Sequence, residues 1–309
     1  MCYGQAMSRW PELTVERDHE TFALLHLAAQ MLGKVRVAHA PWLNHGWHVA
    51  LQPNARGLAT LPTAASDGRT FTLTLDLCRH AIVLWVSDGG REELPLNAGS
   101  VAALHHRLIA MLDLHALPST FNSRPNEVAE AIPFADDSAP RLYDRESAER
   151  LREALAAMLP VFARFRAGFT GKASPVHFWW GSFDLAVTRF SGRPAPQHPG
   201  GVPGLPDRIT REAYSQEVSS AGFWAGGITA AEPFFYSYAY PEPQGFRERK
   251  LDAGGWNEEW QEFTLPYEEV RSASDPEAVL MAFLEGTYDA AADLAHWDRA
   301  KLEREPVAP

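Results

Sequence analysis

The chain has 309 residues, 46% of them hydrophobic, and it carries 28 Lys and Arg residues against 39 Asp and Glu residues, a formal net charge of −11. This length and composition suffice for a substantial core in one or two domains and exclude a disordered chain. The negative charge argues against nucleic acid as a partner, because phosphates would be repelled on average. No apolar run approaches the ~20 residues that span a bilayer, so we expect no membrane partner either.

The cysteine content and the N-terminus point to the cytoplasm. Cys2 and Cys78 are the only cysteines, which supports neither a disulfide framework nor a cysteine-rich zinc site. The first 14 residues lack the basic stretch and apolar core of a signal peptide. Both Met1 and Met7 are possible starts of translation.

The first half of the chain reads as a helix, a set of antiparallel strands and a second helix. Its most regular strand covers residues 70–77, where apolar residues alternate with Thr and Asp. Gly33 is expected to end the first helix, and Ser100 to begin the second. The predicted elements are a helix over residues 20–32, an extended stretch over 47–51, a turn over 53–57, strands over 58–61, 70–77, 81–87 and 94–96, and a helix from 100.

The second half repeats this order. Asp144 caps a predicted helix with apolar residues at spacings of four and three, and Pro160 should kink it or end its first segment. Asp275 and Pro276 begin the last helix, with proline at its first position. The strands expected between these helices cover residues 177–190, 214–224, 234–240 and 263–267.

The two halves also share residues at matching positions. Gly33, Lys34, His39 and Trp42 recur, with the same spacing, as Gly171, Lys172, His177 and Trp180. We therefore predict an α+β fold with an internal duplication: each half is an antiparallel sheet flanked by an N-terminal and a C-terminal helix, and a pseudo-twofold axis relates the halves. The alternative is that two α+β layers resemble each other by chance.

The expected domain organisation follows from these repeats. A crossover is expected between the halves, at the segment that begins Ile132-Pro133-Phe134. The predicted units are an N-terminal extension over residues 1–19, a first repeat over 20–117, a crossover linker over 118–143, a second repeat over 144–299 and a C-terminal tail over 300–309.

Four segments carry a resemblance to a known family. They are Gly-Lys-Val-Arg at residues 33–36, Asn-His-Gly-Trp at 44–47, the block 174–193, which contains His-Phe-Trp-Trp-Gly-Ser-Phe-Asp, and Tyr-Ser-Gln-Glu-Val-Ser at 214–219. With these segments the chain resembles the bacterial domain-of-unknown-function family 5996, from Trp10 to about Arg299. Gly46 stands where that family usually has an aromatic residue. The resemblance implies a soluble bacterial protein with no established activity, and it assigns no catalytic residue.

The block 177–193 is the best candidate for a binding site. It places five large aromatic side chains beside an imidazole, a carboxylate and two guanidinium groups, which is the usual make-up of a small-molecule pocket. His177 and Asp184 would point to opposite sides of a regular strand, but a turn or bulge at Gly181-Ser182 would bring them together. A hydrogen-bonded core histidine is the alternative for His177.

Glu217 is the leading candidate for a general base. It alternates with Ser215 and Ser219 on a strand flanked by aromatics, and an apolar setting would raise its pKa toward neutrality. A solvated strand face is the alternative. The catalytic candidates are Glu217, His177 and Asp184; the ligand-binding candidates are Arg189, Arg193, Trp179, Trp180, Tyr214, Tyr238 and His198.

The two arginines and a loop complete this hypothesis. Arg189 and Arg193 suit a planar anion such as a carboxylate, although salt bridges at the surface would explain them equally well. The segment 193–207 is rich in proline and glycine and contains His198, so we expect a flap over the main cavity against the His177 strand; an ordinary surface loop is the alternative. We expect His177, Asp184, Glu217 and both arginines to converge in one pocket.

A metal site is the weaker hypothesis. It would combine His45, His177 and a carboxylate across the pseudo-twofold axis, since His45 and His48 have the wrong spacing to share one side of a strand. No phosphate-binding loop, nucleophile elbow or His-Glu-x-x-His motif is present, and the sequence requires no cofactor.

Three functions remain open. The first is an enzyme that acts by acid/base chemistry on a polar or carboxylated small molecule in the second half. The second is a non-catalytic protein that binds such a molecule, and the third is a protein-interaction module with exposed aromatics.

Overall fold

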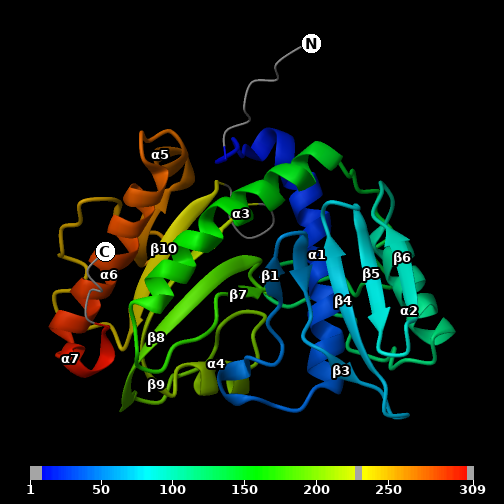
Figure 1. The fold of residues 1–309 in the computed structure, drawn as a ribbon, viewed down its shortest axis with the longest axis horizontal. Helices are drawn as coiled ribbons and strands as arrows, with labels where there is room; N and C mark the ends of the chain where they lie inside the picture. Colours follow the sequence, from blue (N-terminus) through cyan, green and yellow to red (C-terminus); the bar gives the residue numbers. More distant parts are fainter. Residues whose placement is uncertain (1–8, 227–231, 305–309) are drawn as a thin grey trace.

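The computed structural model describes residues 9–226 and 232–304. The described residues form an α+β fold with two antiparallel six-stranded sheets, seven α-helices and one 3-10 helix. Figure 1 shows the two sheets side by side. Cys2 and the alternative starts Met1 and Met7 lie outside the described residues, and Cys78 is an exposed free thiol. In the described part of the chain, no helix is long and apolar enough to cross a membrane.

The helices follow the predicted order with several additions. They are α1 Val15–His39, η1 Asn44–Gly46, α2 Val101–Leu114, α3 Arg145–Ala167, α4 Asp207–Ala213, α5 Tyr267–Arg271, α6 Pro276–Leu294 and α7 Arg299–Leu302. The predicted caps are confirmed, because the side chains of Ser100, Asp144 and Asp275 accept backbone hydrogen bonds from the first turns of α2, α3 and α6. The helix α3 continues through Pro160 instead of ending there.

The end predicted for the first helix is wrong. α1 runs past Gly33 to His39. Gly33 serves packing instead, because a Cβ atom at this position would lie 2.1 Å from Nε1 of Trp180. The indole ring therefore lies directly on the helix backbone, and its Nε1 donates a hydrogen bond to the Val49 carbonyl at 2.9 Å.

The first sheet is a meander with one short extra strand. Its order is β1-β2-β4-β5-β6, with β3 paired to β4. The strands are β1 Gln52–Asn54, β2 Gly57–Ala59, β3 Thr63–Ala64, β4 Thr70–Asp76, β5 Ala81–Val86 and β6 Arg91–Pro95.

The second sheet has the order β11-β12-β10-β9-β8-β7. Its strands are β7 His177–Trp179, β8 Asp184–Pro194, β9 Gln216–Trp224, β10 Phe234–Tyr240, β11 Gly255–Asn257 and β12 Glu262–Pro266. The two sheets meet at one antiparallel bridge, where Leu51 and Phe178 exchange backbone hydrogen bonds of 2.9 Å in both directions.

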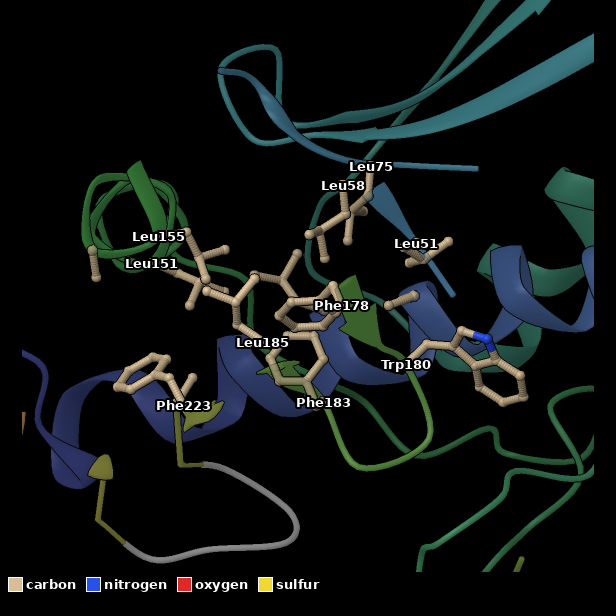
Figure 2. Close-up of a cluster of buried hydrophobic side chains, with 14 of the residues drawn as sticks. Leu51, Leu58, Leu75, Leu151, Leu155, Phe178, Trp180, Phe183, Leu185 and Phe223 are labelled. Atoms are coloured by element: carbon tan, nitrogen blue, oxygen red, sulfur yellow. The ribbon is translucent and has the colours of Figure 1, made fainter. Parts of the chain in front are cut away.

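One hydrophobic core extends under both sheets. Figure 2 shows part of it: Leu58 and Leu75 from the first sheet lie in one cluster with Leu185 and Phe223 from the second, together with Leu151 and Leu155 of α3. Leu185 on β8 and Phe223 on β9 are paired and point toward this core. Because side chains alternate along a strand, the residues directly before and after each of them point away from it. That second, outward face carries the candidate site.

Candidate functional site

The hairpin between β7 and β8 places His177 and Asp184 on the same outward face of the sheet. Its register pairs Trp179 with Asp184 and His177 with Ala186. Paired residues in antiparallel strands project to one side, so the turn at residues 180–183 reverses the parity of a continuous strand. The predicted turn at Gly181-Ser182 is confirmed, and Phe183 adopts the left-handed conformation there (φ 61°).

Asp184, the first residue of β8, is buried on this face. Its carboxylate accepts hydrogen bonds from the hydroxyls of Ser182 and Tyr236. Burial raises the pKa of Asp184 to about 6, although both hydrogen bonds act in the opposite direction. The carboxyl group is thus poised to exchange a proton near neutral pH.

A glycine makes the contact between Tyr236 and Asp184 possible. Tyr236 on β10 pairs with Gly222 on β9, and Asp184 lies one strand further, on β8. A Cβ atom at Gly222 would lie 2.4 Å from the Tyr236 hydroxyl oxygen. The bare backbone therefore lets the phenol ring cross β9 and reach the carboxylate.

Glu127 brings a second carboxyl group from the loop between α2 and α3. Its backbone is in the left-handed conformation (φ 54°), and α1 holds the adjacent residue, since Gln30 accepts a hydrogen bond from the Asn126 backbone at 2.7 Å. The carboxylate lies against Gly181, where a Cβ atom would be 2.0 Å from Glu127 Oε1. Burial, and then repulsion by Asp184, raises the pKa of Glu127 to about 7.

Glu262 is the third carboxyl group. It begins β12 and is paired with Asn257 of β11. Burial, and then repulsion by Asp184, raises its pKa to about 8. In the described ranges, none of these three carboxylates forms an ion pair. We call Asp184, Glu127 and Glu262 the carboxyl cluster.

Glu127 and Glu262 are not among the site residues predicted from the sequence. A signal existed for Glu262, because its position alternates with the buried Phe263 and Leu265 and so places it on the outward face of the expected strand. No sequence signal marks Glu127, since its place depends on a loop that crosses from the first half to the second.

Tyrosines surround the carboxyl cluster. The hydroxyls of Tyr214 and Tyr238 are 2.9 Å apart, and the rings of Tyr236 and Tyr238 are stacked with centroids 6.2 Å apart. Tyr214 follows α4, outside the strand predicted for it. His198 stacks on Tyr214 at 4.9 Å, so the segment 193–207 folds back over this tyrosine face.

The remaining predicted residues lie elsewhere, and the expected convergence is wrong. Arg189 pairs with Ser219 in the sheet, so its side chain and that of Glu217 point to the helix-covered face. Arg189 is buried between Glu285 (3.2 Å) and the Phe165 carbonyl, and Arg193 is 2.6 Å from Glu217. Both arginines bind protein groups. The alternative of a surface salt bridge fits Arg193, whereas Arg189 forms its ion pair in the core.

The segment 193–207 was expected to cover the main cavity, and the cavity lies elsewhere. A cavity of about 260 Å³ lies beside Arg193, Glu217 and Trp297, near the C-terminal end of α6, and not under the folded-back segment. Its two charged side chains, Arg193 and Glu217, form an ion pair with each other, so neither is as free as the carboxyl cluster to bind a ligand or transfer a proton. Trp180, a predicted ligand contact, is instead buried against α1.

His177 lies on the outward face but is buried between two indoles. Its ring centroid is 5.5 Å from that of Trp179 and 6.0 Å from that of Trp47, and Trp47 in turn is 5.2 Å from His45. Burial, and then the nearby Arg166, lowers the pKa of His177 to about 4, which leaves it neutral at pH 7. Within residues 9–226 and 232–304, no group of three or more His, Cys, Asp or Glu side chains is placed to hold a metal ion.

Comparison with known proteins gives a family and no activity. The model of a family described as "Family of unknown function (DUF5996)" matches residues 10–304. No curated protein and no solved structure matches the chain.

Proposed function

The chain belongs to the family of unknown function DUF5996, and we propose that it is an enzyme that acts on a small polar molecule by acid/base chemistry at the carboxyl cluster of the second sheet. The substrate is neutral or positively charged.

One observation carries this proposal: Glu127 and Glu262 both lie close enough to the buried Asp184 for its charge to raise their pKa, and among the described residues none of the three forms an ion pair. Catalytic acids and bases work best when their pKa is near the working pH, and environments that separate the pKa values of neighbouring groups separate their roles. Asp184, with the lowest pKa of the three (about 6), is the base, and Glu262, with the highest (about 8), is the acid.

The surrounding aromatics favour a small ligand at this place. Tyr214 and Tyr238 are half-buried and their hydroxyls are 2.9 Å apart, so part of each side chain stays accessible to a small molecule. Trp179 and Trp224 are also half-buried on this face. Aromatic faces and carboxyl groups together suit hydroxyl, amide or amine groups.

A carboxylated substrate is disfavoured. The anchors expected for it, Arg189 and Arg193, point to the other face and are engaged by Glu285 and Glu217. The carboxyl cluster would also repel an anion, because each ionised member adds negative charge to a poorly solvated site. Of the polar or carboxylated molecules expected from the sequence, we therefore propose a polar substrate that is uncharged or cationic.

The test is a thermal-shift and turnover screen of the purified protein with polyols, amides, amines and, as a negative class, carboxylates. Hits are then tested for turnover by NMR in three proteins: the natural chain, Asp184→Asn and Glu217→Gln. We expect hits among the first three classes, with turnover lost in Asp184→Asn and kept in Glu217→Gln, whose side chain faces away from the cluster.

Two outcomes would decide against the proposal. Equal turnover in Asp184→Asn would remove Asp184 from catalysis. Binding that depends on the carboxyl cluster without turnover of any hit would identify a non-catalytic binding protein.

We further propose that the two halves arose by duplication. Each half has the order helix, antiparallel strands, helix, and the bridge between Leu51 and Phe178 joins the edge strands of both sheets. Superposition of residues 20–115 on 147–295 tests this, and agreement of fewer than four elements in order and orientation would contradict it. Asp184 and Glu262 of the carboxyl cluster lie on the second sheet, and Glu127 joins them from the loop between α2 and α3.

A further inference from the structure

The chain uses lysine sparingly. Of its 28 basic residues only four are lysines: Lys34, Lys172, Lys250 and Lys301. An arginine remains charged at any physiological pH, whereas a lysine amine can lose its proton and act as a nucleophile. Lys250 and Lys301 are exposed, but Lys34 is buried and Lys172 is half-buried.

Lys172 has an unusual set of partners. Its Nζ is 2.5 Å from Nε2 of His45 and 3.1 Å from Oε1 of Gln216. The ring centroids of Phe190 and Trp47 lie 5.0 and 5.9 Å away. No carboxylate pairs with Lys172 in the part of the chain that the structure describes, and burial lowers the pKa of its amine.

The hydrogen bonds of His45 fix which of its nitrogens faces the lysine as an acceptor. Nδ1 is 3.0 Å from the Glu212 carbonyl oxygen, which can only accept, so Nδ1 carries the proton. Nε2 therefore presents its lone pair to Lys172. The Glu212 side chain also accepts the His45 backbone N–H at 3.1 Å, which holds this residue in a left-handed conformation (φ 58°).

These contacts form a nucleophile, a base and a group that orients the base, which is the arrangement that activates nucleophiles in enzymes. We propose that Lys172 is a nucleophilic amine that forms an imine with an aldehyde or ketone bearing an apolar or aromatic group, with His45 as its base. The site lies at the Phe190 end of β8, whereas the carboxyl cluster lies at the Asp184 end. It is therefore a second site, beyond the function proposed above.

The reaction balances without any further reactant. The free amine of Lys172 adds to the carbonyl carbon, a C–N bond forms, and the electron pair of the C=O bond passes to oxygen. His45 Nε2 carries two protons in turn from the nitrogen to that oxygen. The first gives the hydroxyl group of a carbinolamine; the second reaches this hydroxyl group as the C–O bond breaks and the nitrogen lone pair forms the C=N bond, so that water leaves and a neutral imine remains. The rings of Trp47 and Phe190 then flank the substituent on the imine carbon.

The experiment uses the full chain and benzaldehyde as the probe. The protein is incubated at neutral pH, the imine is trapped at timed intervals by reduction with borohydride, and each lysine is followed by peptide mass spectrometry. We expect Lys172 to gain a benzyl group well before Lys250 and Lys301. Lys34 is an internal control: burial lowers its pKa too, to about 8, but its Nζ donates to Asn126, and among the described residues no histidine or carboxylate bonds to it.

Two variants sharpen the result. Lys172→Arg keeps the positive charge and should lose the fast label, and His45→Gln, which keeps a hydrogen-bonding side chain, should slow labelling of Lys172 about 100-fold, the lower end of what a positioned base contributes. The proposal is overturned if Lys172 in the natural chain labels no faster than Lys250 and Lys301. It is also overturned if a folded His45→Gln protein labels at the natural rate, since Lys172 would then react without its base.

Discussion

The two faces of the second sheet bury polar groups in opposite ways. On the helix-covered face, the one large buried cation, Arg189, is paired with Glu285 and packs on the ring of Phe165, whose centroid is 3.5 Å from the guanidinium carbon. On the outward face, three carboxyl groups lie together, and within the described ranges none has a cationic partner.

The paired arginine stabilises the fold, whereas burying carboxyl groups without a cationic partner costs free energy. A buried charge with a partner contributes to a stable core or is neutral, whereas acids without partners must keep their protons to remain buried. Strained or costly arrangements concentrate at functional sites. Both faces share the strands β8, β9 and β10, so side-chain alternation places Asp184 and Arg189 on opposite faces of one strand. The loop that carries Glu127 adds a further carboxyl group to the outward face.

The largest effect is expected on the helix-covered face. Arg189→Ala removes a fully buried guanidinium, its ion pair and its contacts with Phe165 and Tyr288. We expect the free energy of unfolding, measured by urea denaturation, to fall by about 3 kcal/mol, the lower end for a broken buried pair, because the half-exposed Glu285 can be rehydrated.

Arg193→Ala is the matched control. This arginine pairs with Glu217 at 2.6 Å, but its side chain is 46% exposed, and exposed pairs contribute less than about 1 kcal/mol. Equal losses in the two variants would mean that Arg189 is not the structural anchor of its face.

On the outward face, Glu262 should make the free energy of unfolding depend on pH. The pKa of Glu262 is raised to about 8 in the folded protein, while in the unfolded chain it lies near 4.3. Between these values the folded state holds the proton that the unfolded state has lost, so the contribution of Glu262 is fully present at low pH and is lost as pH rises toward 8. Glu262→Gln, which stays neutral, should therefore gain about 1 kcal/mol or more relative to the natural chain between pH 5 and pH 8.

The difference between the two proteins isolates this effect. Buried His26 and His177, whose pKa is lowered to about 4, add a slope of opposite sign, and it cancels when the variant is subtracted from the natural chain. Glu259→Gln, at an exposed position of the same hairpin, is the control and should show no such gain. A Glu262→Gln curve parallel to that of the natural chain would show that the carboxyl group is not buried as an acid.

The sequence predicted the elements where one physical signal dominates. Strict alternation identified β4 at Thr70–Asp76, and an aspartate followed by proline identified the start of α6. It failed at Gly33, where a local rule for helix ends competes with a tertiary contact, because only the folded chain brings the Trp180 ring onto that glycine.

The part of the candidate site that depends on local sequence signals was predictable, and the part that depends on tertiary contacts was not. The Gly181-Ser182 turn and the row of tyrosines on β10 are local, so His177, Asp184 and Tyr238 were found on one face. Glu127 is separated from Asp184 by more than fifty positions of sequence and reaches it through a loop. A continuous strand over residues 177–190 would place Arg189 on the same side as His177, whereas the turn at residues 180–183 restarts the alternation and puts Arg189 on the other face. Glu217 shares that face because Ser219, two residues further on, pairs with Arg189.

The smallest effect is expected at Glu217, the residue that the sequence favoured as a base. Its side chain accepts two hydrogen bonds from Arg193, and that arginine also donates to the Ala295 carbonyl at 2.6 Å. Both bonds end on one carboxylate oxygen, Oε2, so in Glu217→Gln the amide oxygen can keep them while the charge is lost. The half-exposed Arg193 remains solvated, so the free energy of unfolding should change by about 0.5 kcal/mol. Thermal or urea denaturation measures this change, and turnover of any substrate found in the screen should be unaltered. A folded Glu217→Gln protein without turnover would move the catalytic centre from the outward face to the cavity beside Arg193 and Trp297 and would reverse the functional contrast between the two faces.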